Sequence, residues 1–95
     1  MYCVTVDFTI KPGAMEAFLP RMRQQRDDSL TLEEGCTAFE IWTAEAHPDR
    51  VFLYEIYTSA DAFEDHLASD HFHSFAVAVE RLVEARVLCR WEKLV

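Results

Sequence analysis

The sequence contains little glycine: Gly13 and Gly35 are the only two among 95 residues. Phosphate-binding loops and dinucleotide-binding turns need several glycines in one short segment, because the backbone must approach the phosphates closely. A nucleophile elbow likewise needs glycines on both sides of its serine. These motifs are therefore excluded, and we expect no nucleotide cofactor.

Positive charge and long apolar runs are also scarce. Nine Lys and Arg residues against 17 Asp and Glu residues give a formal net charge of −8 and a pI of about 4.8. An acidic chain repels phosphate backbones, so we expect no nucleic-acid partner. No apolar run approaches the roughly 20 residues of a membrane-spanning helix, and the N-terminus lacks the features of a signal peptide. We expect no membrane association.

The three cysteines, Cys3, Cys36 and Cys89, show no Cys-x-x-Cys spacing. An odd set inside strand-like segments fits small buried hydrophobes better than a disulfide framework or a zinc site. We therefore expect a reduced, cytoplasmic protein.

Apolar residues make up 51% of the chain, enough for one core, so we expect a single domain over residues 1–95. Alternation of apolar and polar residues predicts strands at 2–10, 36–44, 51–58 and 86–95, with a turn at 47–50. Helical periodicity predicts a first helix to about residue 32, bent at Pro20, with Leu30 on its apolar face and Gly35 as its C-terminal stop. A second helical region after Ser59 breaks near Ser69-Asp70. The order β-α-β-β-α-β predicts an α+β, ferredoxin-like split βαβ fold with a four-stranded antiparallel sheet.

The predicted strands are apolar on both faces. In the third strand Phe52, Tyr54 and Ile56 share one face, while Val51 and Leu53 share the other. Two helices cover only one face of such a sheet, and the uncovered face is normally polar. We expect a homodimer in which the sheet faces of two copies cover one another.

Three of the four histidines cluster in the stretch HLASDHFHSF, residues 66–75. Metal-binding helical pairs are spaced by three or four residues, whereas His66 and His71 are five apart, about 140° on a helix. We therefore expect no shared metal ion. His73 is predicted to be solvated and His71 to pack or hydrogen-bond at a helix start. His66 is predicted to be either a satisfied, partly buried residue or a proton-transfer group in a pocket.

Glu55 interrupts the apolar strand VFLYEIY, and Asp7 is a milder case in the first strand. A carboxylate there needs a partner or a pocket. Glu55 is predicted to form a structural ion pair with Arg86 or Arg90, or to act as a pocket acid or base with a raised pKa.

The chain resembles the antibiotic biosynthesis monooxygenase family, whose members are small dimeric α+β barrels. The resemblance covers nearly the whole chain. It rests on an ordered set of segments: Lys11-Pro12-Gly13, Glu34-Gly35-Cys36, Tyr54-Glu55, and His66, Ser69, His71 and Phe72.

This resemblance implies a cofactor-independent monooxygenase that oxidises a small quinol or aromatic substrate with O2. The implied catalytic residues are His66, Glu55 and His71, and the implied substrate-binding residues are Asp7, Trp42, Tyr54 and Phe72. The haem-degrading branch uses an Asn, a Trp and a His where this chain has Asp7, His66 and Ala76, which argues against haem. A non-oxidative relative, either an isomerase or a binding module without catalysis, is the alternative.

Overall fold

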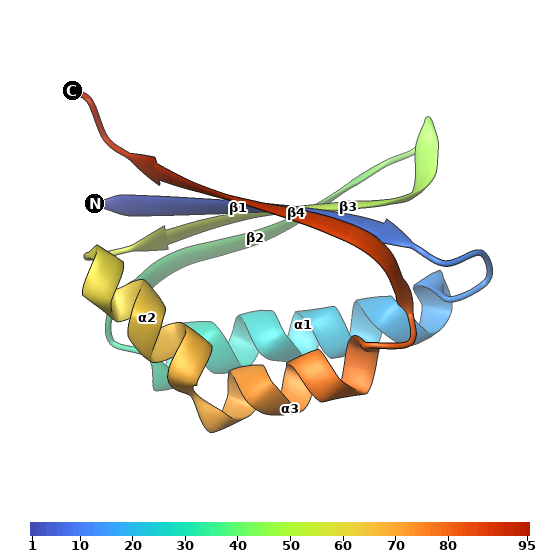
Figure 1. The fold of residues 1–95 in the computed structure, drawn as a ribbon, viewed down its shortest axis with the longest axis horizontal. Coiled ribbons are helices and arrows are strands. Elements are labelled where there is room, and N and C mark those ends of the chain that lie inside the picture. The colour runs from blue at the N-terminus through green and yellow to red at the C-terminus, as the bar shows by residue number, and fades with distance from the viewer.

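The computed structural model describes residues 1–95, and its elements follow the predicted order. They are β1 (Tyr2–Ile10), α1 (Met15–Leu32), β2 (Cys36–Ala44), β3 (His47–Tyr57), α2 (Ala60–Ala68), α3 (Asp70–Val79) and β4 (Val83–Glu92). The strands form one antiparallel sheet in the order β2-β3-β1-β4. All three helices lie against one face of this sheet (Figure 1). The predicted ferredoxin-like α+β fold is confirmed, with three helices.

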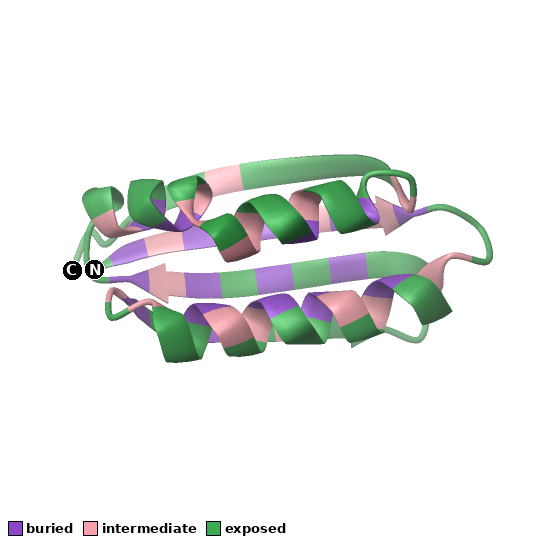
Figure 2. Cartoon of the chain, turned by 90° about the horizontal axis from the view of Figure 1, so that it is seen from below, coloured by how far each residue is buried: buried purple, intermediate pink, exposed green.

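The core lies between the helices and the inner face of the sheet. Alternation along β1 buries every second side chain, and β3 continues the same face. The buried residues of these two strands are Tyr2, Val4, Val6, Phe8, Ile10, Val51, Leu53, Glu55 and Tyr57. The stripes of buried residues in Figure 2 follow this period of two. β4 lies at the edge of the sheet, and its inward-facing side chains are not fully covered by the helices. Leu88, for example, is 44% exposed.

The buried face of α1 differs from the predicted one. Phe18, Met22, Gln25 and Ser29 are buried, whereas Leu30 is 42% exposed. Spacings of four, three and four residues keep the buried set on one side of a helix, even though its last two members are polar. The prediction for Leu30 was wrong because it followed hydrophobicity rather than the spacing.

Two turn predictions were also wrong. The β2–β3 turn falls at residues 45–46, and β3 already begins at His47. Pro48 is tolerated in this strand because it lies where the pairing with β2 shifts register. Gly35 is not the left-handed stop of α1, since Gly13 alone has a positive φ. A Cβ atom at Gly35 would lie 2.6 Å from the Cβ of Ala62, so glycine permits close contact with α2.

Ser59 and Ser69 mark the starts of α2 and α3, and Ser69 divides the second helical region into these two helices. The hydroxyl of Ser59 accepts a hydrogen bond from the Ala62 amide, and that of Ser69 accepts one from the Phe72 amide. Each is an N-cap that satisfies a free amide of its helix. α3 ends at Val79, and β4 begins at Val83, three residues before the strand start predicted at residue 86. No helix in the structure is both long and apolar enough to cross a membrane.

Candidate functional site

A small cavity of about 40 Å³ lies between the inner sheet face and the helices. Its wall is mainly apolar and aromatic, and a few polar side chains also reach it; the lining includes Phe39, Phe63, Phe72, Phe75, Gln25, Glu55, His66 and Arg86. A water molecule needs about 10–15 Å³ of such space. The cavity therefore holds a few water-sized molecules and is too small for an aromatic substrate.

Glu55 reaches this cavity from β3 and is 3% exposed. The Tyr57 hydroxyl donates a hydrogen bond to its Oε1 at 2.6 Å. Burial raises the pKa of Glu55 to about 7; Tyr57 and His66 oppose the rise and Glu33 adds to it. The carboxyl group is therefore near the midpoint of its titration at neutral pH.

The predicted ion pairs of Glu55 do not form. Arg90 instead pairs with Glu64 at 2.7 Å, and it lies over the ring of Phe63. Arg86 lines the cavity but makes no ion pair with Glu55. The structure therefore places Glu55 as a pocket carboxyl rather than as half of a structural ion pair.

His66 reaches the same cavity from the last turn of α2 and is 3% exposed. Its Nδ1 lies 2.8 Å from Oε2 of Glu33, the residue that ends α1. The ring stacks on Phe63 at 5.7 Å between centroids and lies 5.1 Å from the ring of Phe72. The carboxylate thus orients the imidazole through Nδ1, and Nε2 makes no hydrogen bond within the chain.

His71 lies in the first turn of α3 and contacts the same carboxylate. Its Nε2 is 2.8 Å from Oε2 of Glu33, and its Nδ1 is 3.4 Å from Oε1 of Gln25. The rings of His66 and His71 are 5.9 Å apart. The expectation that these two histidines do not converge was wrong: the helix break was predicted near Ser69-Asp70, but spacing along a helix does not show how the turn at Ser69 directs the two side chains. Glu33, His66 and His71 each offer an atom within 4.8 Å of the others, so this cluster could hold a metal ion.

The remaining predicted site residues separate into two groups. Phe72 lines the cavity with Glu55 and His66. Asp7, Trp42 and Tyr54 point to the outer face of the sheet, because Thr5 pairs with Tyr54 and Asp7 with Phe52 in the register that turns Glu55 inward. Asp7 forms an ion pair with Arg50 there at 2.6 Å. Within one chain these three residues do not meet the cavity.

The sequence analysis did not predict four residues that belong to this site: Gln25, Glu33, Tyr57 and Arg86. It considered Arg86 only as an ion-pair partner of Glu55. Gln25 could have been found as a polar residue that continues the buried spacing of α1. Glu33 directly precedes the Glu-Gly-Cys segment, but nothing local marks it as the partner of two distant histidines. Tyr57 is two residues after Glu55 and shares its strand face.

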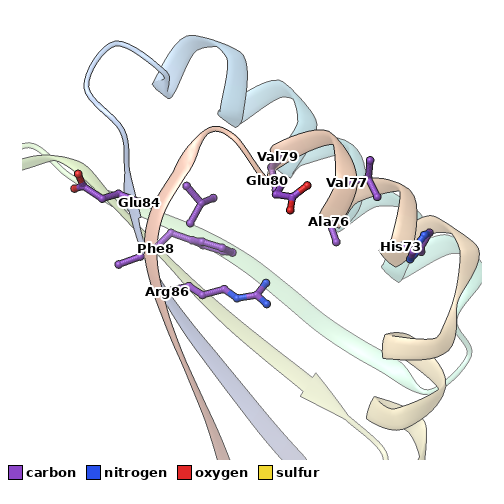
Figure 3. A pocket seen from close by; sticks show the side chains of 10 residues that line it. Phe8, His73, Ala76, Val77, Val79, Glu80, Glu84 and Arg86 are labelled. Atoms are coloured by element: carbon purple, nitrogen blue, oxygen red, sulfur yellow. The ribbon is translucent and has the colours of Figure 1, made fainter.

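A second, open cleft of about 410 Å³ lies between α3 and β4. Figure 3 shows His73 of α3 and Glu80, which follows α3, on one side and Glu84 and Arg86 of β4 on the other. Phe8 and Arg86 line both this cleft and the inner cavity. The two spaces therefore adjoin, and a volume of several hundred Å³ is typical of small-molecule sites.

Comparisons with known proteins agree with this architecture. The model of a family described as antibiotic biosynthesis monooxygenase matches residues 1–78. A Nitrosomonas europaea structure, assigned provisionally to the same enzymes, is 26% identical over 100% of both chains, with a TM-score of 0.92. A Shewanella oneidensis structure is 26% identical over 97% of this chain and 89% of its own, with a TM-score of 0.87. A Caulobacter crescentus structure at 18% identity and a TM-score of 0.93, covering 99% and 90%, supports the fold alone. No curated protein sequence matches the chain.

Proposed function

Because the chain belongs to the antibiotic biosynthesis monooxygenase family, we propose that it is a cofactor-independent monooxygenase acting on a small quinol or an aromatic, polyketide-like substrate with O2. The observation that carries this proposal is that two buried proton-transfer groups, Glu55 and His66, face one apolar cavity. Oxygenation without a cofactor requires the substrate to supply the electrons. An ionised phenol or quinol does so, provided that a base removes its proton in a site that excludes water.

His66 is the proposed base. Its Nδ1 is held by Glu33, which leaves Nε2 to accept the substrate proton. For an anthrone-like substrate, the resulting anion transfers electrons to O2, one oxygen atom enters the product and the other leaves as water with the two hydrogens lost by the substrate. His71 does not line the cavity. It is a positioning residue that acts through its contact with Glu33.

Glu55 is the proposed proton donor. A carboxyl group that is protonated near neutral pH can donate a hydrogen bond to the developing anion or a proton to reduced oxygen. Because the pKa of Glu55 is about 7, the protonated carboxyl group that this role requires predominates below pH 7. We expect kcat to fall as the pH rises through about 7, and Glu55→Gln to flatten this limb of the profile. A wild-type profile that rises through the same range would contradict this role.

The open cleft between α3 and β4 and the adjoining inner cavity together are the proposed substrate site, since the inner cavity alone is too small and only the inner cavity is lined by Glu55 and His66. Phe8 and Arg86 stand where the two spaces adjoin, and the Arg86 guanidinium would attract an ionised phenolate. Arg86→Met is expected to raise KM with a smaller effect on kcat, whereas Arg81→Met, an exposed arginine outside both linings, serves as the matched control.

The decisive experiment is oxygen uptake by metal-free and haem-free protein with a panel of quinols and anthrone-like phenols. Uptake above the autoxidation rate is expected, and His66→Ala should reduce it by about 10²–10⁴-fold. The control is His47→Ala, which removes an exposed histidine outside both the inner cavity and the cleft between α3 and β4. Uptake no faster than autoxidation across the panel would count against oxygenation of these substrates. Tight binding without turnover would favour the binding-module alternative, and conversion without oxygen uptake the isomerase.

The outer face of the sheet supports a proposed homodimer. It presents large exposed apolar side chains that no element of the chain covers: Trp42 at 58%, Phe52 at 37%, Tyr54 at 37%, Val87 at 62% and Trp91 at 54%. The indole N–H of Trp91 donates to the Thr5 hydroxyl at 2.9 Å, so the polar tip is satisfied within the chain. Figure 1 shows this face bare, opposite the helices. Contiguous apolar surface of this kind marks an interface.

Light scattering during size-exclusion chromatography tests the dimer. Wild-type protein should elute with twice the chain mass, and Trp91→Glu should elute as a monomer because a buried charge would face the partner sheet. Val77→Glu is the matched control, since Val77 is 62% exposed on α3, away from the sheet face. A monomeric wild type at micromolar concentration would refute this assembly.

A further inference from the structure

The cluster of Glu33, His66 and His71 joins three helix ends. Glu33 ends α1, His66 lies in the last turn of α2 and His71 in the first turn of α3. Oε2 of Glu33 lies 2.8 Å from Nδ1 of His66 and 2.8 Å from Nε2 of His71. The three side chains are between 4% and 13% exposed, so water competes little for them.

Two atoms of this cluster are buried without a hydrogen-bond partner: Oε1 of Glu33 and Nε2 of His71. Nε2 is close to the carboxylate, but the contact lacks hydrogen-bond geometry. Buried polar atoms are nearly always paired, so each unpaired one needs an explanation. A cation bound beside the carboxylate would satisfy both atoms at once.

The side chains next to His71 favour the imidazole tautomer that can bind a metal ion. Its Nδ1 faces Oε1 of Gln25 at 3.4 Å, and the amide group of Gln25 in turn faces the Ser29 hydroxyl at 3.5 Å. A carbonyl oxygen opposite Nδ1 favours the tautomer that carries its proton there, which leaves a lone pair on Nε2. Nε2 then lies 2.8 Å from a carboxylate oxygen that is out of line for a hydrogen bond, and a positive charge beside both electron-rich atoms would stabilise this contact. Metal-binding histidines usually have such an acceptor on the second nitrogen.

An acidic cleft gives access to the cluster from outside. This cleft of about 540 Å³ is lined by Glu33 and His71 and also by Glu34, Asp61 and Asp65. Carboxylates lining a concave surface raise the local concentration of cations. His66 lines the inner cavity on the other side. The cluster therefore lies between a cation-attracting cleft and the proposed reaction space.

We infer that Glu33, His66 and His71 form a binding site for a divalent transition-metal ion that enters through this acidic cleft. Two imidazole nitrogens and one carboxylate oxygen suit Zn²⁺, Co²⁺, Fe²⁺ or Mn²⁺ better than Mg²⁺ or Ca²⁺, and they leave coordination positions open. Bonds of about 2.0–2.1 Å in a tetrahedral arrangement separate the ligand atoms by about 3.3 Å. The two 2.8 Å contacts must open by about half an ångström, which small side-chain rotations provide.

This inference goes beyond the proposed oxygenation, which is measured on metal-free protein. Protein dialysed against EDTA is titrated with ZnCl₂ by calorimetry and with CoCl₂ by visible absorption, and the bound metal is counted by elemental analysis. We expect one ion per chain for the wild type and for His73→Ala. Glu33→Gln and His71→Ala should bind at least about tenfold more weakly, and Gln25→Ala should show a smaller loss. Far-UV circular dichroism identifies a variant that has not folded.

Two outcomes would overturn the site. If His71→Ala and Glu33→Gln bind zinc as the wild type does, the ion binds elsewhere on the acidic surface. If the wild type binds no zinc or cobalt at millimolar concentration, the cluster is an ion pair between a protonated His71 and Glu33. Neither outcome affects oxygen uptake by metal-free protein, so each proposal can fail without the other.

Discussion

Replacing Glu55 by glutamine should change how stability depends on pH. Burial of Glu55 raises its pKa from an ordinary value of 4.5 to about 7 in the folded chain. Between these values the folded state binds more protons than the unfolded state, so the free energy of unfolding decreases as pH rises. This contribution to stability is fully present below about pH 4.5 and is lost as pH passes through about 7. Glutamine is neutral throughout and removes the effect.

The size of the effect follows from the width of this pH range. Each unit of pKa corresponds to about 1.4 kcal/mol, so the free energy of unfolding should fall by about 3 kcal/mol in total, at about 1.4 kcal/mol per pH unit between 4.5 and 7. Because a buried carboxylate is costly, Glu55→Gln should match the wild type near pH 4.5 and exceed it by up to about 3 kcal/mol at pH 8. The Tyr57 hydroxyl can still donate to the amide oxygen of glutamine.

Urea unfolding of metal-free protein at pH 5, 6, 7 and 8 and at one protein concentration measures this difference. Subtracting the variant from the wild type cancels the titration of all other groups that the substitution leaves unchanged. Glu45→Gln makes the same chemical change at an exposed position in the β2–β3 turn and should run parallel to the wild type. If Glu55→Gln also ran parallel to the wild type, Glu55 would be ionised throughout and its proposed role as a proton donor would fail.

Three further substitutions test the packing around the site. Gly35→Ala should destabilise the fold by about 1–3 kcal/mol, because its Cβ would overlap that of Ala62 at 2.6 Å; adding Ala62→Gly should recover most of the loss in a double-mutant cycle measured by urea unfolding, and no recovery would place the strain elsewhere. Ser69→Ala should cost about 0.5–2 kcal/mol by removing the α3 N-cap, as judged by thermal unfolding, and an unchanged midpoint would show that the cap contributes nothing. Tyr57→Phe removes the donor that lowers the pKa of Glu55, so the fall in stability with pH should extend above pH 7; a range moved to lower pH would contradict the hydrogen bond's role.

The sequence by itself determined the order of elements and the orientation of the strands. Alternation along β1 and β3 identified their two faces correctly, because a side chain in a strand points to the face set by its position. It also marked Glu55 as an exception that needed a pocket or a partner. The second helical region was predicted to follow Ser59, and Ser59 is indeed the N-cap of α2, because capping is a contact between neighbours in the chain.

Tertiary structure decided which distant residues meet. Glu33 is 33 residues from His66 in the chain, and their contact depends on how the end of α1 lies against α2. The bend at Ser69 brought together two histidines that a single straight helix would have kept apart. Packing of all three helices on one side of the sheet (Figure 1) placed Glu55 at the cavity and left Tyr54 on the opposite, uncovered face. Local sequence patterns determine the periodicity of each helix and strand. The way in which helices and strands pack against one another depends on the whole core, and the candidate site lies where the ends of three helices meet.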